Sequence, residues 1–437
     1  MATESKSDVA SANPTKDFFV YMITRDIDTL PAIAELVDNS IDGALKIREN
    51  GDFRGLKINI IIDKEHFIIE DNCGGIDLET AKKYAFKFGR KIGDYRNANS
   101  GLFTGLYGIG MKRSLFKLGE RFKISSKTTS ESFEVDVDVN EWMQEDLWQF
   151  KMDNIVTGAH FKEKDCGTKI EISNLHIQQS KLFSDEVFIN KLFSFLESCR
   201  FNEINNGLVI TLNGIKVSPA EVTLLEDENV SSFKSFIKDD DGEIRIVAGI
   251  THMGFPEKAG WYVFCNGRLV LQADKTTVSG WGVKSRAFHP EMAYFRGYVF
   301  FESKDLLKLP WNTTKTGVDT TNRLYLLALD DMAKAVKQIS GSINRITKAY
   351  DVSSVDEIDI IKNAKVEIIN SRYVKRIENP NNFTITTTKD GSETKNVTIR
   401  AIVTKEKADL ARDSLKVRSY TELCKAVFEY YCDMEGI

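Results

Sequence analysis

The stretch Ile33-Ala34-Glu35-Leu36-Val37-Asp38-Asn39-Ser40-Ile41-Asp42-Gly43-Ala44 is the most informative part of this chain. Pro31 just before it suits the first turn of a helix. Small or apolar residues recur there at helical spacing, namely Ala32, Ile33, Leu36, Val37, Ser40, Ile41 and Ala44. Glu35 and Asn39 are four residues apart, so both project from the same face. This pair either belongs to a solvated surface or supplies a water-activating base and a metal ligand.

Three further segments point to a phosphate-binding site. A short buried strand at 66–70 runs into the turn Asp71-Asn72-Cys73-Gly74-Gly75-Ile76. The run Gly105-Leu106-Tyr107-Gly108-Ile109-Gly110 precedes an apolar-periodic helix at 111–118. Glycines let a backbone approach phosphate closely, and a helix N-terminus supplies N–H groups and a favourable dipole. Finally, Cys166-Gly167-Thr168 leads into a strand at 169–172.

In order and spacing, these four segments resemble the GHKL ATPases, the family of gyrase B, MutL, the large heat-shock chaperones, MORC proteins and histidine kinases. The resemblance covers about residues 1–175 and is specific because all four motifs occur together. It implies an α+β fold that begins with a Bergerat-type ATP-binding α/β sandwich. A βαβ transducer domain (ribosomal S5 domain 2-like) and a small C-terminal appendage are expected to follow.

The resemblance gives the matching residues roles in binding and hydrolysing ATP. Glu35 is expected to be the general base that deprotonates the attacking water. Asn39 is expected to hold Mg²⁺, which offsets the charge of the phosphates. Asp71 is expected to accept a hydrogen bond from the adenine amino group, with support from Thr168, and Gly75 to line the nucleotide pocket.

A lid over the phosphates is expected at 86–104, which is rich in Gly, Asn, Arg and Lys. Gly105, Gly108 and Gly110 are expected to form its phosphate-facing hinge. One residue departs from the family pattern Asp-x-Gly-x-Gly, because Cys73 occupies the first glycine position. Cys73 is either a small buried apolar residue or a redox-sensitive thiol beside the pocket.

Other phosphate-binding motifs fit less well. A P-loop requires lysine and then Ser or Thr directly after its last glycine, whereas Met111 follows Gly110 here. No GxGxxG opens a βαβ unit at the place that a dinucleotide fold requires. A histidine kinase normally carries asparagine at the position of Glu35, because it transfers phosphate to protein. Glu35 therefore favours a hydrolase.

Composition indicates an ordered globular protein of two to four domains. The chain has 437 residues, of which 42% are hydrophobic and 28% charged. Its six cysteines are scattered without CxxC pairs, which is typical of reduced thiols rather than a zinc site. No signal peptide or membrane-spanning run is evident, so we expect a cytoplasmic protein (nuclear if eukaryotic) without membrane partners. The net charge of −5 gives no global basic signature for nucleic acid.

The sequence predicts four parts: an N-terminal arm at 1–25, the ATPase domain at 26–180, the transducer at 181–345 and the appendage at 346–437. A helix at 185–200 is expected to begin the transducer, and a hairpin is expected at 208–217 around Asn213-Gly214. Helices are predicted at 320–350, 355–377 and 420–434. A further hairpin is predicted at 381–404. The last helix either packs in a small terminal domain or docks a partner.

Two segments extend the resemblance beyond residue 180. The sequence from Trp261 to Val270 contains Cys265-Asn266-Gly267-Arg268 and resembles a transducer strand–turn–strand of MutL and MORC proteins. The segment 310–318 resembles the loop whose lysine, here Lys315, reaches the γ-phosphate. Such a lysine would bind ATP better than ADP and so bias two conformations. Otherwise, Lys315 is an ordinary surface lysine.

The resulting hypothesis is Mg-dependent ATP hydrolysis that drives conformational change and formation of a homodimer. The arm at 16–25 either crosses to a second subunit or packs on its own. The alternative is an ATP-sensing subunit of a larger assembly with little turnover. A third reading is a DNA clamp in genome maintenance or defence, acting with a separate effector or client. Five basic residues then form either a DNA face or a solvated helix surface: Lys112, Arg113, Lys117, Arg121 and Lys123.

Overall fold

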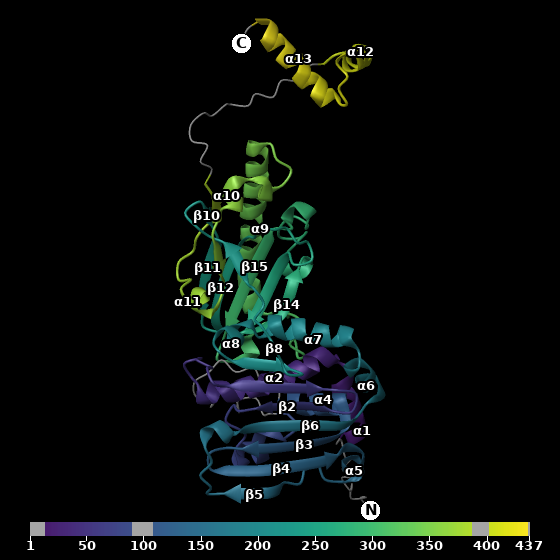
Figure 1. Cartoon of the computed structure of the whole chain (residues 1–437), viewed down its shortest axis with the longest axis vertical. Coiled ribbons are helices and arrows are strands. Elements are labelled where there is room, and N and C mark those ends of the chain that lie inside the picture. The colour runs from purple at the N-terminus through teal and green to yellow at the C-terminus, as the bar shows by residue number, and fades with distance from the viewer. Residues whose placement is uncertain (1–13, 90–107, 387–401, 436–437) are drawn as a thin grey trace, which may run out of the picture. The chain divides into compact units, whose positions relative to one another are not determined.

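The computed structural model describes residues 14–89, 108–386 and 402–435. The chain divides into two compact units, residues 1–387 and 388–437 (Figure 1). The larger unit contains two large β-sheets with their covering helices, and two small two-stranded sheets. Within the described ranges, no helix combines the length and the apolar character needed to cross a bilayer.

The first sheet has eight strands in the order β5-β4-β3-β6-β2-β1-β7-β8 (Figure 1). All neighbours are antiparallel except β1 and β7, which are parallel. The strands are β1 (Lys57–Ile62), β2 (Phe67–Asp71), β3 (Gly119–Lys127), β4 (Glu131–Asp138), β5 (Asp153–Thr157), β6 (Gly167–Leu175), β7 (Val209–Leu212) and β8 (Ile215–Lys216). In β1, Ile58, Ile60 and Ile62 are buried, because alternate residues face the core.

The helices of this first layer are α1 (Lys16–Arg25), α2 (Thr29–Ile47), α3 (Leu78–Thr80), the π-helix η1 (Ala81–Ala85), α4 (Gly110–Leu118), α5 (Val139–Gln144), the 3₁₀-helix η2 (Glu163–Asp165), α6 (Ile177–Phe183), α7 (Glu186–Cys199) and α8 (Phe201–Asn205). The predicted helix around Glu35 is confirmed as α2. Its apolar stripe, including Leu36 and Val37, is buried in a core shared with the sheet, and α2 packs against α4. Gly43 permits a close approach of the Asp71 turn, because a Cβ there would lie 2.7 Å from the Cys73 carbonyl oxygen.

The second sheet has five strands in the order β11-β12-β15-β13-β14, and β13 and β15 are parallel. They are β11 (Phe233–Asp239), β12 (Gly242–Ile250), β13 (Gly260–Cys265), β14 (Arg268–Asp274) and β15 (Phe295–Glu302). The predicted helix at 320–350 is confirmed as the long helix α9 (Arg323–Tyr350). It packs against β11, β12 and β15. Its buried stripe runs from Leu324 to Ile346 and closes a second hydrophobic core.

Short elements complete the larger unit. They are β9 (Thr223–Leu225), β10 (Val230–Ser231), η3 (Thr277–Ser279), η4 (Pro290–Met292), η5 (Leu306–Lys308), η6 (Val355–Glu357), α10 (Asp359–Lys362), β16 (Val366–Ile368), α11 (Ser371–Lys375) and β17 (Thr384–Ile385). The predicted helix at 355–377 is wrong, since this segment contains η6, α10, β16 and α11. Strand β16 pairs with β9, and this pairing overrides the local helical pattern.

The layers do not follow the boundaries drawn from the sequence. Strand β7 lies beyond residue 180, yet it hydrogen-bonds to β1 and extends the first sheet. Residues 346–385 contribute Ile346, Ile361 and Ile385 to the second core rather than to a separate appendage. Strand β17 pairs with β10, and the Asp390-Gly391 turn of the predicted hairpin lies outside the described residues.

The smaller unit contains α12 (Lys405–Leu415) and α13 (Tyr420–Glu435). The predicted helix at 420–434 is confirmed as α13. Leu423 is buried, whereas Val427, Phe428, Tyr430, Tyr431 and Met434 are exposed. These exposed side chains leave the choice between a terminal core and a docking helix open.

Candidate functional site

The end of β2 brings Asp71 and Thr168 together. The carboxylate of Asp71 accepts hydrogen bonds from Ser40 Oγ (2.6 Å), the Cys73 backbone N–H (2.9 Å) and the Thr168 backbone N–H (3.2 Å). Burial raises the pKa of Asp71 above its usual value, and the three donors oppose that rise. Ser40, one turn along α2 from Glu35, was not predicted to take part. Thr168 contacts Asp71 through its backbone.

The glycine turn after β2 fits tightly against the neighbouring strands. Gly75 has a φ of +72°, and a Cβ there would lie 2.2 Å from the Lys127 carbonyl oxygen. Only glycine adopts this conformation at this distance without strain. Cys73 is buried, and burial raises the pKa of its thiol, so the thiol remains protonated. The interpretation of Cys73 as a small buried apolar residue is confirmed.

Glu35 lies buried on α2 with three cations around one of its oxygens. Its Oε1 is 3.1 Å from Lys315 Nζ, 3.5 Å from Arg268 Nη1 and 3.9 Å from Arg113 Nη2. The other oxygen faces the start of α4, where a Cβ on Gly110 would lie 2.1 Å from Oε2. Glu35 is therefore not part of a solvated surface.

Lys315 is buried, so the surface-lysine interpretation is wrong. It lies in a loop closed by a bridge between Trp311 and Val318, and its φ is +53°. A non-glycine residue in the left-handed region is uncommon and marks a backbone held by its surroundings. Hydrogen bonds from the Lys315 and Thr316 N–H groups to Asn312 hold this turn. The loop that follows the second sheet thereby places the Lys315 side chain next to α2.

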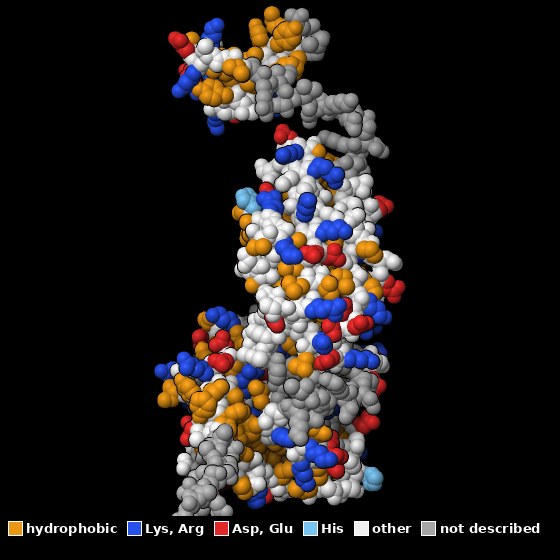
Figure 2. Space-filling view, turned by 180° about the vertical axis from the view of Figure 1, so that it is seen from behind, with side chains coloured by type: hydrophobic (Ala, Val, Ile, Leu, Met, Phe, Trp, Pro, Cys, Tyr) orange, Lys and Arg blue, Asp and Glu red, His pale blue; other side chains and the backbone are white. Residues whose placement is uncertain are grey.

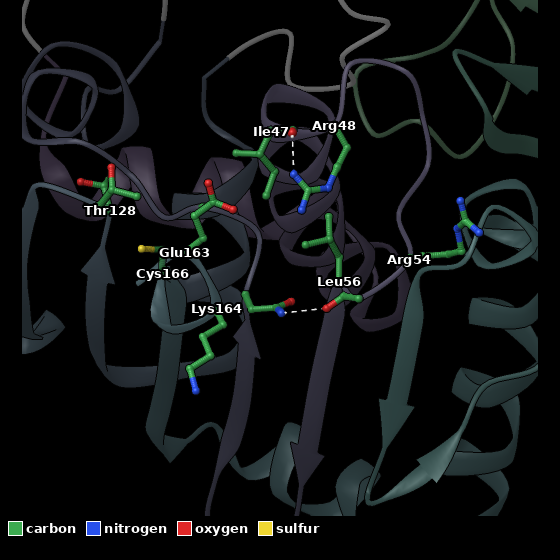
Figure 3. A pocket seen from close by; sticks show the side chains of 12 residues that line it. Ile47, Arg48, Arg54, Leu56, Thr128, Glu163, Lys164 and Cys166 are labelled. Atoms are coloured by element: carbon green, nitrogen blue, oxygen red, sulfur yellow. Dashed lines mark hydrogen bonds between the residues drawn. The ribbon is translucent and has the colours of Figure 1, made fainter. Parts of the chain in front are cut away.

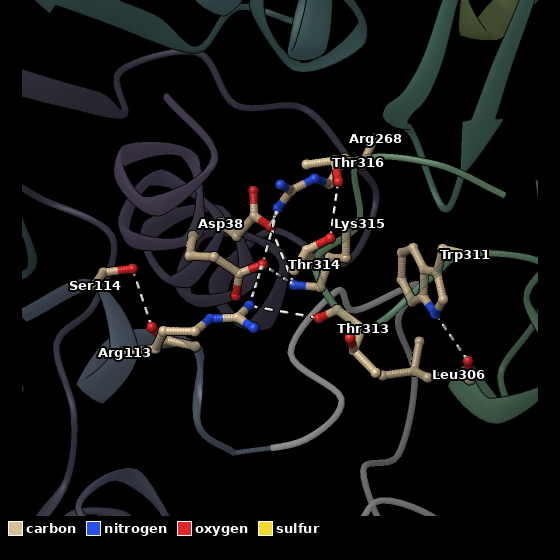
Figure 4. Close-up of polar contacts among 12 residues, drawn as sticks. Asp38, Arg113, Ser114, Arg268, Leu306, Trp311, Thr313, Thr314, Lys315 and Thr316 are labelled. Atoms are coloured by element: carbon tan, nitrogen blue, oxygen red, sulfur yellow. Dashed lines mark hydrogen bonds and ion pairs between the residues drawn. The ribbon is translucent and has the colours of Figure 1, made fainter. Parts of the chain in front are cut away.

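Asp38 is a central residue of this charged cluster that sequence reasoning missed. It is buried one turn from Glu35, and its two oxygens contact Arg200, Arg268 and Lys315. Figure 4 shows Asp38 beside Arg268 and Lys315. Arg200 lies between α7 and α8, and Arg268 begins β14. The three-residue spacing of Glu35 and Asp38 was a usable signal, because such residues share a helix face. Nothing local in the sequence indicated the two arginines as their partners.

The remaining predicted site residues lie at the edge of this cluster or outside the described ranges. Asn39 is exposed on α2. Gly108 has a φ of +66° directly before α4. Gly105 and positions 90–104 of the predicted lid lie outside the described residues.

The suggested basic face on α4 and β3 is contradicted at Lys112 and Arg113, whereas Arg121 and Lys123 are exposed. Lys112 and Arg113 are buried rather than presented to DNA or solvent. Lys112 Nζ donates to the carbonyl oxygens of Ala85 (2.7 Å) and Gly108, and Lys117 Nζ donates to Thr24 (3.0 Å). Arg121 and Lys123 pair with acidic residues on β4. Packing of α4 between α2 and α1 removes its basic side chains from the surface.

The predicted arm is the helix α1, which packs on its own chain. Lys16 Nζ donates to the carbonyl oxygens of Trp142 (2.6 Å) and Glu145 (2.7 Å), and Phe19 packs edge-on against Phe88 and Trp148. Three large side chains of α1 are still exposed, namely Phe18, Tyr21 and Met22. Hydrophobic side chains gather at the lower left of Figure 2, where the N-terminal part of the described chain lies.

A pocket of about 470 Å³ opens beside the Asp71 turn (Figure 3). Its wall includes Asn72 and Gly74 from the turn, Arg48 after α2, and Lys164 and Cys166 before β6. None of the residues predicted from the family resemblance lines it. The pocket therefore adjoins the predicted adenine contact without containing it.

The cluster around Glu35 fits an anionic ligand. Four buried cations surround the carboxylates of Glu35 and Asp38: Arg113, Arg200, Arg268 and Lys315. Among the described residues, Arg113 Nε, Arg200 Nε and Arg268 Nη2 are buried without a hydrogen-bond partner. Buried donors normally have partners, and phosphate oxygens would supply them.

The donor set also fits Mg²⁺ held partly by a nucleotide. Within the described ranges, no group of three or more His, Cys, Asp or Glu forms a metal site. Mg²⁺ in nucleotide sites usually has one or two protein ligands and completes its shell with phosphates and water. The exposed amide of Asn39, one turn from Glu35, suits such a ligand.

Comparison with known proteins supports this interpretation of the first layer. No curated protein matches the chain. Residues 27–168 match the family model described as "Histidine kinase-, DNA gyrase B-, and HSP90-like ATPase". That range contains α2, the Asp71 turn, α4 and the start of β6, which hold Glu35, Asp71, Gly110 and Thr168. Residues 27–168 are therefore similar to the ATP-binding domain of GHKL-type ATPases.

Proposed function

We propose that this protein binds Mg·ATP, hydrolyses it and uses the cycle to switch between conformations. The observation that carries the proposal is the 3.1 Å contact between Lys315 and Glu35. It joins the loop after the second sheet to α2 of the ATPase layer. A ligand that binds this junction acts on both layers at once.

In this proposal each residue does one task. Asp71 accepts the adenine amino group, beside Thr168 and Gly75. Asn39 would hold Mg²⁺, which would supply positive charge to offset that of the phosphates. The N-terminus of α4, with Gly108 and Gly110, receives the phosphates, and Gly105 lies in the same run. Glu35 takes the proton of the attacking water, and Lys315 contacts the terminal phosphate.

The five-stranded sheet with α9 is the proposed transducer. Its loop carries Lys315, and Arg268 begins its strand β14. With Arg200, three of the four cations of the site therefore come from outside residues 27–168. This arrangement agrees with a resemblance to MutL and MORC proteins. Measurement of Mg²⁺-dependent phosphate release, together with ATP binding by the full chain, tests the proposal. Absence of ATP binding would overturn it.

ATP sensing without turnover is the second candidate. Three cations already share the Glu35 carboxylate, and each competes with a water for its lone pairs. Tight binding of ATP with no phosphate release would favour this function. Release above the rate in buffer would exclude it.

Replacement of Gly110 by alanine should impair hydrolysis. The added Cβ would lie 2.1 Å from Glu35 Oε2, so either α4 or the carboxylate must move. A displacement near 1 Å at a reacting group costs about 10²-fold in rate. Phosphate release under saturating ATP measures the effect. Gly341→Ala is the matched control, because a Cβ there meets nothing within 4 Å. Equal rates in the two variants would contradict the placement of Gly110.

Binding of ATP should weaken on acidification through the pKa of Asp71. Burial raises this pKa above its ordinary value, so the folded protein gains a proton here before an unfolded chain does. The proton removes an acceptor for the adenine amino group. Protonation of Asp71 also removes the cost of burying its charge. The contribution of Asp71 to folding stability is therefore full below its ordinary pKa and is lost as pH rises through its raised pKa. Calorimetric titrations across pH should show the loss in wild type. Asp71→Asn should bind weakly at every pH. If ATP affinity fell with acidification equally in wild type and in Asp71→Asn, the role of Asp71 in adenine binding would be refuted.

The protein should dimerise with ATP but not with ADP. A dimer is common among GHKL ATPases, and the exposed Phe18, Tyr21 and Met22 on α1 offer apolar surface for one. Sedimentation velocity with a non-hydrolysable ATP analogue should give about twice the mass found with ADP. Glu186→Gln, an exposed change on α7, should behave as wild type. The same mass with both nucleotides would rule out an ATP-dependent dimer.

A further inference from the structure

Asp38 concentrates three cations from separate parts of the chain on one carboxylate. Arg200 pairs with Oδ1, whereas Arg268 and Lys315 both pair with Oδ2. Arg200 and Arg268 are nearly inaccessible to solvent, with exposed fractions of 0% and 1%. In such surroundings charges interact more strongly than at the surface, so the cations compete for Asp38.

Lys315 is shared between two acceptors. Its Nζ lies 3.1 Å from Glu35 Oε1 and 3.3 Å from Asp38 Oδ2, so neither carboxylate holds it alone. Arg268 contacts the same two carboxylates, but much more closely at Asp38 than at Glu35. A guanidinium stays charged at all relevant pH values, and Arg268 therefore offsets the charge of Asp38 permanently. Without it, Arg200 and Lys315 would be the cations left on Asp38, and we expect Asp38 to draw Lys315 away from Glu35.

The position of Arg268 is fixed by the turn that precedes it. Asn266 and Gly267 have φ values of +46° and +81°, as a tight hairpin turn between β13 and β14 requires. The Asn266 side chain exchanges two hydrogen bonds with the backbone of Ser303, at 3.0 Å each. A Cβ on Gly267 would lie 2.9 Å from Glu203 Oε1, so the turn packs directly on α8. Arg268 is thus held rigidly by the second sheet.

We propose that Arg268 is a positioning residue, which neutralises Asp38 and thereby leaves Lys315 available to the terminal phosphate of ATP. It acts through Asp38 and Lys315 rather than on the nucleotide. The part of the inference that concerns ATP rests on the proposed function. The competition among Arg268, Asp38 and Lys315 is a property of the protein alone.

The first arm of the test measures that competition without nucleotide. Urea unfolding is compared for wild type, Lys315→Met, Arg268→Met and the double variant. Loss of Lys315 should lower the unfolding midpoint more in the Arg268→Met background, because Asp38 then depends on the lysine. Additive shifts would overturn the inference, whatever the protein does with ATP. Arg268→Gln, which keeps polar donors but removes the charge, replaces Arg268→Met if that variant does not fold.

The second arm measures discrimination between a non-hydrolysable ATP analogue and ADP, as the ratio of their dissociation constants. Lys315→Met should lower this ratio about tenfold, and Arg268→Met should lower it similarly. Arg268→Met combined with Asp38→Asn should recover much of it, because Lys315 is no longer drawn to a carboxylate whose charge only Arg200 offsets. A mere loss of packing would not be rescued in this way. Arg121→Met, which breaks an exposed pair, should leave the ratio unchanged.

The two arms separate the inference from the proposed function. Coupled midpoints with an ATP:ADP ratio that does not respond to Lys315→Met would refute the role of Lys315 toward ATP, while the Arg268–Asp38 competition stands. A ratio that responds to Lys315→Met but not to Arg268→Met would refute the role of Arg268 and leave the proposed function intact.

Discussion

Glu35→Gln should bind Mg·ATP and release almost no phosphate. The substitution keeps the size of the side chain but removes the carboxylate that would take a proton from water. Loss of a general base typically lowers the rate about 10²–10⁴-fold. Lys315, Arg268 and Arg113 can still donate to the glutamine amide oxygen, and Arg268 and Lys315 keep Asp38 as a charged partner, so this variant should fold with reduced stability. Phosphate release at saturating ATP, measured with binding by calorimetry, gives both quantities.

The control for this experiment is Glu186→Gln, an exposed change in the first turn of α7. It should leave the rate and the affinity unchanged. Equal phosphate release by Glu35→Gln and wild type would contradict the role of Glu35 as base. Release by neither protein, with ATP bound by both, would favour the sensing function instead.

Local patterns in the sequence predicted the parts of the site that a single segment determines. The stripe of small and apolar residues defined α2, and the position of Asp71 after a short strand placed it at the end of β2. The contact between Asp71 and Thr168 joins residues 97 positions apart. It was expected only because the family resemblance linked the two motifs.

The ion pairs of Asp38 could not be predicted in the same way. Its pair with Arg268 spans 230 positions, and an arginine that begins a strand carries no local sign of its partner. The burial of the basic residues of α4 could not be predicted for a related reason, since it also depends on tertiary packing. Lys112 and Arg113 look solvated by composition, yet packing against α2 buries them beside backbone carbonyls and Glu35. Tertiary packing also converted part of the predicted helix at 355–377 into strand β16.

Asp38→Asn should destabilise the larger unit strongly, although the side chain keeps its size. The change leaves Arg200, Arg268 and Lys315 buried around an uncharged group. Breaking a buried ion pair from one side typically costs about 3–5 kcal/mol, because the remaining charges lose their partner. Urea unfolding followed by circular dichroism measures the difference in unfolding free energy from wild type.

Asp136→Asn is the matched control, since Asp136 pairs with Arg121 at the surface, with side chains 42% and 50% exposed. A surface pair of this kind contributes about 0–1 kcal/mol, so the control should unfold close to wild type. A similar small effect for Asp38→Asn would mean that Glu35 alone balances the cations. The larger effect would instead make Asp38 the charge that holds α2, α7, β14 and the Lys315 loop together. Movement of the second sheet would then be tied to the geometry around Glu35, as a nucleotide-driven switch requires.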